Sequence, residues 1–286
     1  MTSPIKPLGG KRLTKDDIEK LRQSLPKRMD ITPEGVTTSC EDSEEAIAPI
    51  LEDKAPQVEV PLSAEEIRAF QVYASMLRET NKVMNLTAVT DSEGIAMKHF
   101  IDSLTLCPYI RREEERAGHK IKLADVGTGA GFPGIPLKIS MPEVEVTLLD
   151  SLAKRLNFLK SVIDRLGLKG TALVHARAED GGRDKRYREK FDIATARAVA
   201  ALPVLAEYCL PFVKVGGVFL AMKGKAEEEI SSAERAVALL GGRIEQVDTF
   251  TLPGSDLQRT IIVIRKERPT PAIYPRKAGT PAKSPL

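Results

Sequence analysis

The sequence contains few of the residues that build metal and disulfide sites. It has three cysteines, Cys40, Cys107 and Cys209, three histidines and no tryptophan among 286 residues. The cysteines are widely separated, which fits no zinc-ligand pattern. We therefore expect no metal, and we expect Cys107 and Cys209 to be small buried hydrophobic residues of a protein from a reducing compartment.

Long apolar stretches are also missing. No run approaches the roughly 18 apolar residues that cross a bilayer, and Met1–Lys20 lacks the apolar core of a signal peptide. Hydrophobic residues make up 42% and charged residues 29%, as in ordinary globular proteins. These features predict a cytoplasmic protein without membrane attachment, and we expect a monomer.

Net charge alone does not indicate a nucleic-acid partner, because it is only +3. Its distribution says more, since basic residues outnumber acidic ones strongly over residues 265–286. Such a segment can contact phosphates, or it can be a solvated tail without a partner. Charge leaves both interpretations open.

The first 60 residues combine an acidic cluster at 41–45 with scattered prolines and few large apolar residues. This composition predicts a poorly ordered extension, with a short helix at most over 16–25. We place one folded domain at 61–286. It comprises a helical part over 61–118, an α/β core over 119–268 and a basic tail over 269–286.

The helical part begins with Ser63-Ala-Glu-Glu66, a capping-box pattern. Apolar residues at helical spacing then predict a helix to about Thr80, a loop over 81–90 and a second helix over 93–106.

From Ile121 onward, strand patterns alternate with helix patterns. We expect helices at 135–140, 152–166, 202–213 and 226–240, and strands at 121–126, 144–149, 171–175, 191–196, 217–222, 243–252 and 260–265. The alternation predicts an α/β fold with a doubly wound, mostly parallel sheet. The last two strands flank Pro253-Gly-Ser-Asp256 with no helix between them, so the sheet should end in an antiparallel hairpin.

A glycine-rich turn follows the first strand, with Gly127, Gly129, Gly131 and Gly134. Glycine lets a backbone approach a ligand closely, and ligands of open α/β sheets bind beyond the strands' carboxyl ends. Asp150 ends the second strand, where an acid can bind ribose hydroxyls. The pattern predicts an adenosine-containing cofactor. A tight packing turn and a helix-capping Asp150 are the alternatives.

Other polar residues follow later strands. Ala178-Glu179-Asp180 can reach an adenine amine or form an ordinary acidic loop. Arg197 can bind a cofactor carboxylate or an RNA phosphate, or form a structural ion pair. His99 and Asp102 share one helix face, and we expect them to shape the substrate site or the structure.

Three functions remain compatible with these residues. The glycine turn and Asp150 suit a nicotinamide-dependent oxidoreductase as well as an S-adenosylmethionine-dependent methyltransferase, and the basic tail suits an RNA-binding protein without catalysis. The terminal hairpin favours the methyltransferase, because a dinucleotide dehydrogenase more often continues with a second βαβαβ half.

Longer motifs from about residue 63 to the C-terminus resemble the 16S rRNA guanine-7 methyltransferase family, also called glucose-inhibited division protein B. They are Asn81-Lys-Val-Met-Asn-Leu-Thr87, Lys98-His-Phe-Ile-Asp-Ser-Leu104, Asp125-Val-Gly-Thr-Gly-Ala-Gly-Phe-Pro-Gly-Ile-Pro136, Leu148-Leu-Asp-Ser-Leu152, Thr195-Ala-Arg-Ala198 and Tyr274-Pro-Arg-Lys-Ala-Gly-Thr-Pro-Ala-Lys283.

The resemblance implies a class I methyltransferase fold with an N-terminal helical part. It implies methyl transfer from S-adenosylmethionine to ring nitrogen 7 of a guanine in 16S rRNA of the small ribosomal subunit. In the family, cofactor contacts fall on positions that match Gly127, Phe132, Ala178, Glu179 and Arg197, with Phe132 replacing a common Leu. To these the turn adds Gly129, Gly131 and Asp150. Candidate RNA contacts are Lys98, His99, Arg276, Lys277 and Lys283.

This reaction needs little from acid–base groups. Ring nitrogen 7 of guanine carries a free lone pair and no proton, so it can attack the sulfonium methyl without a general base. Catalysis can then rest on proximity and in-line orientation. We therefore assign no catalytic residue from the sequence.

Overall fold

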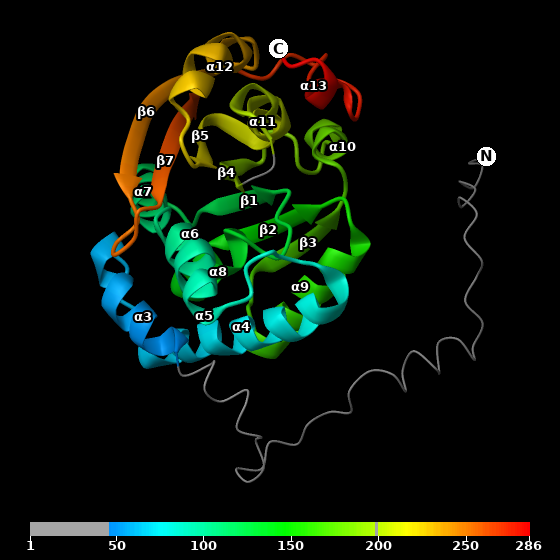
Figure 1. Ribbon diagram of the computed structural model, residues 1–286. Coiled ribbons are helices and arrows are strands. Elements are labelled where there is room, and N and C mark those ends of the chain that lie inside the picture. The colour runs from blue at the N-terminus through cyan, green and yellow to red at the C-terminus, as the bar shows by residue number, and fades with distance from the viewer. Residues whose placement is uncertain (1–45, 198–199) are drawn as a thin grey trace, which may run out of the picture. The chain divides into compact units, whose positions relative to one another are not determined.

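A seven-stranded sheet forms the centre of the computed structural model, which describes residues 46–197 and 200–286 (Figure 1). The strand order is β3-β2-β1-β4-β5-β7-β6. β1 to β5 are parallel, and β7 runs antiparallel to both β5 and β6. The predicted mostly parallel sheet with a terminal hairpin is confirmed. The strands are β1 (Lys122–Val126), β2 (Glu145–Asp150), β3 (Thr171–His175), β4 (Phe191–Arg197), β5 (Val213–Lys223), β6 (Gly242–Thr251) and β7 (Gln258–Lys266).

Helices cover both faces of the sheet because successive side chains of each strand point to opposite faces. Leu123 of β1 joins the hydrophobic cluster beneath α4 (Ala64–Met84), α8 (Gly134–Ser140) and α9 (Ala153–Leu166). Ala124, the next residue, joins the other cluster, beneath α11 (Leu202–Cys209) and α12 (Glu227–Leu239). Figure 1 shows these two helical layers on either side of the strands, with α10 (Ala178–Arg183) beside α11.

The order of the strands reverses between β1 and β4. The chain passes from β1 outward to β2 and β3, and then returns to place β4 on the other side of β1. In open α/β sheets the loops on either side of such a reversal separate and leave room for a ligand. The glycine turn after β1 and Arg197 at the end of β4 both lie at this point.

The N-terminal helical part begins earlier than the sequence suggested. Ile47 and Leu51 of helix α3 (Ile47–Lys54) are fully buried in the core that includes α4. The extension predicted over 1–60 is therefore wrong for residues 46–60, because one apolar pair at helical spacing is enough to dock a short helix. Residues 1–45, which include Cys40 and the short helix predicted over 16–25, lie outside the described residues.

Helix α4 starts with the predicted capping box between Ser63 and Glu66, but it ends at Met84 rather than Thr80. Asn81 does not break the helix, because its side chain exchanges two 2.9 Å hydrogen bonds with the backbone of Thr87. The following segment therefore folds back onto α4. The remaining elements of this part are η1 (Pro56–Val58), α5 (Ser92–Gly94), the π-helical η2 (Ile95–Ile101), α6 (Asp102–Leu104) and α7 (Cys107–Ala117).

The last 20 residues pack against the domain rather than extend into solvent. The buried ammonium of Lys266 donates to the Leu210 carbonyl and to Thr270 Oγ1. The Arg188 guanidinium donates to the carbonyls of Thr270 and Tyr274. Short helix α13 (Thr280–Lys283) follows. The interpretation of this segment as a solvated tail is therefore wrong.

Three further sequence predictions concern cysteine burial, the end of a helix and membrane spans. Cys107 and Cys209 are both buried free thiols, as predicted. The predicted helix over 202–213 stops at Cys209, and a 3-10 turn, η3 (Leu210–Phe212), leads directly into β5. Within the described ranges, no helix is long and apolar enough to span a bilayer.

Candidate functional site

The glycine-rich turn connects β1 to α8 at the strand reversal. Gly127 and Gly129 adopt φ values of 77° and 60°, which glycine reaches without the steric cost of a side chain. The amide of Gly127 donates to the Leu149 carbonyl, and the amide of Gly129 donates to Asp150 Oδ2 at 3.0 Å. The turn is therefore held against the carboxyl end of β2.

Not every glycine of the turn faces the same way. A Cβ atom added to Gly131 would lie 2.7 Å from the side chains of Ile135, Leu159 and Tyr73, well inside van der Waals contact. Gly131 does not line the cavity beside the turn. The missing side chain of Gly131 therefore lets α4, α8 and α9 pack closely, and its assignment as a cofactor-binding residue stays a prediction.

A cavity of about 570 Å³ lies beyond the carboxyl ends of β1 to β4, and we call it the cofactor cavity. Pockets for small molecules and cofactors in proteins commonly have this size. Eight residues singled out in the sequence line it: His99, Gly127, Gly129, Phe132, Asp150, Ala178, Glu179 and Arg197. Leu86, Thr87, Gly279 and Ala282 also line it, and the sequence indicated them only as members of family motifs; Arg155 and Tyr208 were not indicated at all.

Asp150 lies between the start of α9 and the cofactor cavity. Its carboxylate is buried at the end of β2, accepts from the Leu152 amide at the start of α9, and contacts Arg155 at 3.3 Å. It also lines the cofactor cavity. A carboxylate at this position suits ribose hydroxyls, and an apolar wall from Leu149 suits an adenine ring. The residues present therefore fit an adenosine-containing cofactor.

Glu179 joins the cavity to the C-terminal segment. It is buried in the first turn of α10, and its Oε1 accepts from the Gly279 amide at 2.7 Å. Gly279 and Ala282 thereby form part of the cavity wall. The sequence suggested that Glu179 could reach a ligand, but it did not predict the contact with Gly279. These two residues lie 100 positions apart, and no local pattern indicates such a contact.

Arg197 links β4 to the N-terminal helical part. Its Nη1 donates to the Lys98 carbonyl at 2.8 Å and to Asp102 Oδ2 at 3.1 Å, and its Nη2 lies 3.2 Å from His99 Nδ1. The guanidinium also lies over the Phe132 ring, with 4.9 Å between its carbon and the ring centroid. These contacts hold the guanidinium of Arg197 against the η2–α6 segment.

His99 is neutral at physiological pH. It stacks on Phe132 with 4.4 Å between ring centroids. Burial and the positive charge of Arg197 lower the pKa of His99 to about 4. His99 Nδ1 lies 3.2 Å from Arg197 Nη2, a donor, and 3.1 Å from the Lys98 carbonyl oxygen, an acceptor, while Nε2 lies 2.8 Å from Thr87 Oγ1, so either ring nitrogen can carry the proton. His99 and Asp102 are joined through Arg197, and they do not act as an acid–base pair.

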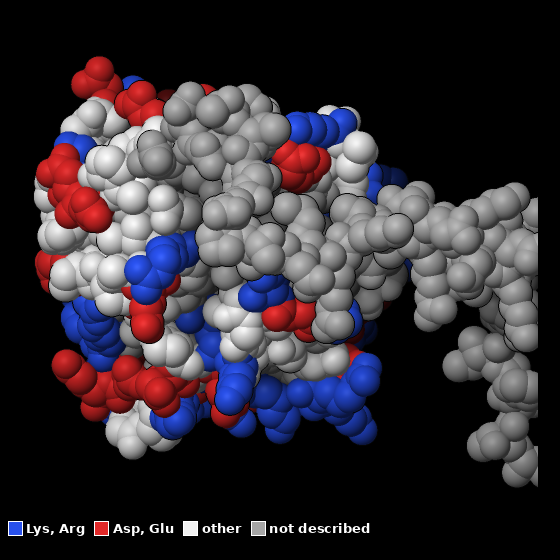
Figure 2. Space-filling view, turned by 90° about the horizontal axis from the view of Figure 1, so that it is seen from below, with Lys and Arg blue, Asp and Glu red and all other residues white. Residues whose placement is uncertain are grey.

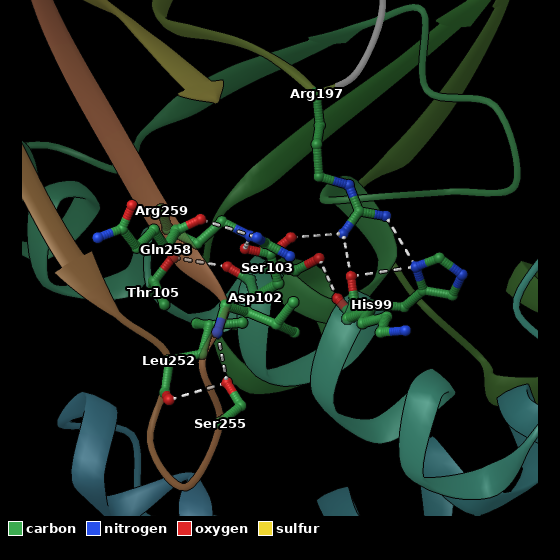
Figure 3. Close-up of polar contacts among 11 residues, drawn as sticks. His99, Asp102, Ser103, Thr105, Arg197, Leu252, Ser255, Gln258 and Arg259 are labelled. Atoms are coloured by element: carbon green, nitrogen blue, oxygen red, sulfur yellow. Dashed lines mark hydrogen bonds and ion pairs between the residues drawn. The ribbon is translucent and has the colours of Figure 1, made fainter. Parts of the chain in front are cut away.

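Asp102 connects two arginines that the sequence places far apart. Its buried carboxylate accepts from Arg197 through Oδ2 and from Arg259 Nε of β7 through Oδ1, the latter at 2.8 Å. Figure 3 shows Arg259, Asp102 and Arg197 in one row, with His99 at its end. We did not identify Arg259 from the sequence, because it lies in a strand without a motif.

Asp125 is a second residue whose importance appears only in the structure. It lies buried in β1, and its Oδ2 accepts from Thr128 Oγ1 at 2.6 Å and from the Gly134 amide at 2.9 Å. Its Oδ1 has no partner among the described residues. Burial raises the pKa of Asp125 to about 6. An acidic residue inside an otherwise apolar strand is the signal that could have identified it.

The candidate RNA contacts differ in their availability. Lys98, Lys277 and Lys283 are exposed. Arg276 instead forms a forked ion pair with Glu207, with Nη2 at 2.6 Å from Oε2 and Nε at 2.9 Å from Oε1. Because the Glu207 side chain is only 1% exposed, Arg276 neutralises a buried charge. Arg276 therefore has a structural role, and its contact with RNA stays a prediction.

Comparison with known proteins decides the family. Residues 66–261 match the family model described as rRNA small subunit methyltransferase G. The chain belongs to this family. Its relatives include ribosomal RNA small subunit methyltransferase G of Acetivibrio thermocellus, 56% identical over 79% of this chain and 91% of that protein. The proteins of the same name from Desulfitobacterium hafniense and Leuconostoc mesenteroides are 51% and 49% identical, over 80% and 79% of this chain and 93% and 94% of their own lengths.

The methyltransferase G match and the cofactor cavity coincide in the chain. The matched range begins in α4 and ends in β7, and it therefore includes the glycine turn, Asp150, Glu179 and Arg197. The wall formed by Gly279 and Ala282 lies after it.

Proposed function

We propose that this member of the methyltransferase G family transfers the methyl group of S-adenosylmethionine to ring nitrogen 7 of a guanine in 16S rRNA of the small ribosomal subunit. The proposal rests on the cofactor cavity of this chain, which the glycine turn, Asp150 and Glu179 form at the strand reversal. The chain that forms this cavity belongs to the methyltransferase G family.

The cavity residues divide the work of holding the cofactor. Gly127 and Gly129 let the backbone approach it, and Asp150 binds its ribose hydroxyls. Leu149 would border the adenine, with Ala178 and Glu179 at its edge. When bound, S-adenosylmethionine supplies an electrophilic methyl group on a positively charged sulfur. Arg197 acts mainly as a positioning residue, because its guanidinium holds the η2–α6 segment.

Proton transfer has no part in the methylation step. Guanine nitrogen 7 presents a lone pair and carries no proton, so its attack on the methyl group requires no general base. The chain therefore contributes orientation and exclusion of water, which alone can supply several kcal/mol of barrier reduction, on the order of 7–11 in favourable cases.

Methyl transfer in vitro with labelled S-adenosylmethionine tests the proposal. Free 16S rRNA and 30S subunits from a strain lacking the gene are compared as substrates, and mass mapping identifies the methylated base. We expect 7-methylguanine at one position. Methylation of another base, or no transfer to either substrate by folded protein, would overturn the proposal.

A nicotinamide cofactor is the alternative that the same turn allows. Calorimetry with S-adenosylmethionine and NADH separates the two, and tight binding of NADH alone would reverse the assignment.

We further propose that the protein works in the cytoplasm as a monomer without a metal. Light scattering after size-exclusion chromatography tests whether the protein is a monomer. Activity that survives EDTA treatment would support independence from a metal.

A further inference from the structure

A second cavity, of about 290 Å³, adjoins the cofactor cavity, and we call it the basic pocket. Strand pairing explains its position, because Arg197 of β4 lies opposite Met222 of β5, and Lys223 lies opposite Thr260 of β7, next to Arg259. The pocket and the cofactor cavity share His99 and Arg197 as lining residues. Anything bound in the basic pocket therefore lies beside the methyl-transfer site.

Positive charge dominates this pocket. Four cationic side chains and one carboxylate line it: Lys98, Arg197, Lys223, Arg259 and Asp102. The carboxylate is already bonded to both arginines. Figure 2, which views the molecule from below Figure 1, shows acidic and basic side chains close to one another along the lower part of this face and uncharged side chains over much of the rest that is not grey. The pocket therefore concentrates positive charge directly beside the cofactor cavity.

Several donors in the pocket remain available. Lys98 is exposed, and its ammonium makes no hydrogen bond or ion pair with any described residue. Arg259 uses Nε for Asp102 and Nη1 for the Gln258 carbonyl, and its Nη2 has no partner within the described ranges. Lys223 is held more firmly, by Glu229 and the Ala200 carbonyl, both at 2.9 Å.

The balance of donors and acceptors indicates an oxyanion as the occupant. A guanine edge would require acceptors for its N–H groups, and the one carboxylate among the described residues that line the pocket is occupied by Arg197 and Arg259. Charged donors fixed by a buried carboxylate suit a phosphate instead, since such charge-assisted bonds are about twice as strong as neutral ones. Contacts to phosphates position a nucleic acid on its protein.

We propose that the basic pocket binds the RNA phosphate next to the target guanine, with Lys98 and Arg259 as its donors, and so directs the base toward His99 and Phe132 in the cofactor cavity. This inference rests on the proposed function. The carboxylate of S-adenosylmethionine offers the same chemistry, so the experiment has to distinguish the two oxyanions.

The test compares Lys98→Ala with Lys98→Arg and a control, Lys160→Ala. Lys160 is an exposed lysine of α9 paired only with Asp164, and it lines neither cavity. For each variant, kcat/KM for RNA methylation is measured from 50 to 200 mM salt, and the Kd for S-adenosylmethionine is measured by calorimetry. Because Lys98 is exposed, its replacement leaves the fold intact, which thermal unfolding verifies.

We expect Lys98→Ala to lower kcat/KM about tenfold and to reduce the slope of log(kcat/KM) against log salt by about 1, as for a lost phosphate contact. Its Kd for S-adenosylmethionine stays within about twofold of wild type. Lys98→Arg recovers most of the activity, and Lys160→Ala matches the wild type.

Two results would overturn the inference. An unchanged salt slope with kcat/KM within about twofold of wild type would remove the pocket from the RNA interface. An equal loss of S-adenosylmethionine affinity would assign the pocket to the cofactor carboxylate. Both differ from a failure of the proposed function, in which the wild-type protein itself methylates no guanine.

Discussion

Replacing Arg276 with alanine tests how the C-terminal segment is held. Arg276 donates to Glu207 through its backbone amide, Nε and Nη2. Because the Glu207 side chain is 1% exposed, Arg276→Ala leaves an unpaired charge inside the protein. Breaking a buried ion pair in this way costs about 3–5 kcal/mol. The Arg276 side chain is 24% exposed, so screening by water favours the lower end, about 3 kcal/mol.

This loss has a predictable size in thermal unfolding. For a domain of 150–250 residues, roughly 2–4 °C of Tm correspond to each kcal/mol, so we expect Tm to fall by about 6–12 °C. The Gly279 amide, three residues further on, donates to Glu179 in the cofactor wall. Arg276→Ala should therefore also weaken S-adenosylmethionine binding, as measured by calorimetry well below Tm.

Matched variants isolate the cause. Adding Glu207→Gln to Arg276→Ala removes the buried charge and should recover part of the lost stability. Arg186→Ala breaks the exposed pair with Asp184 and should change stability by less than about 1 kcal/mol. A Tm drop below about 2 °C, together with a reduced salt slope for RNA methylation, would refute this reasoning and assign Arg276 to the RNA interface.

Three further substitutions separate ligand contacts from packing. Gly127→Val should abolish S-adenosylmethionine binding in calorimetry, because a β-branched residue disfavours φ of 77° and fills the approach to the ligand; normal affinity of the folded variant would contradict this. Gly131→Ala should instead lower the free energy of unfolding by about 1–3 kcal/mol through contacts with Tyr73 and its neighbours, and a fully stable variant would refute the packing role. Because burial raises the pKa of Asp125 to about 6 from an ordinary 3.8, the folded state binds this proton more tightly than the unfolded chain. Asp125 thus contributes stability below about pH 4 that is lost as pH rises through 6. Asp125→Asn should remove that loss, on the order of 3 kcal/mol, in urea unfolding at pH 4 and pH 8, and a pH dependence equal to that of wild type would argue against it.

Much of the fold was predictable because it depends on local patterns. Strand and helix periodicities repeat within short windows, so the sheet, its terminal hairpin and the capping box at Ser63 followed from neighbouring residues. The glycine turn and Asp150 were predictable for the same reason, because the backbone conformation of a turn and the position where a strand ends both depend on neighbouring residues. Helix α3 escaped prediction because its apolar run, Ile47–Leu51, is short and follows the acidic cluster at 41–45, and its burial depends on packing against α4.

The sequence by itself determined the fold class, the family resemblance and the position of the cofactor site along the chain. Only the tertiary structure decided which side chains share that site. Arg197 lies 95 residues from Asp102, and Arg259 lies 157 residues from it, yet both bind the same carboxylate. Gly129 faces the cavity and Gly131 faces the core, although they are two residues apart. The burial of a side chain, its ion pairs and the direction in which it points depend on which strands become neighbours. Strand order is a property of the whole packed chain.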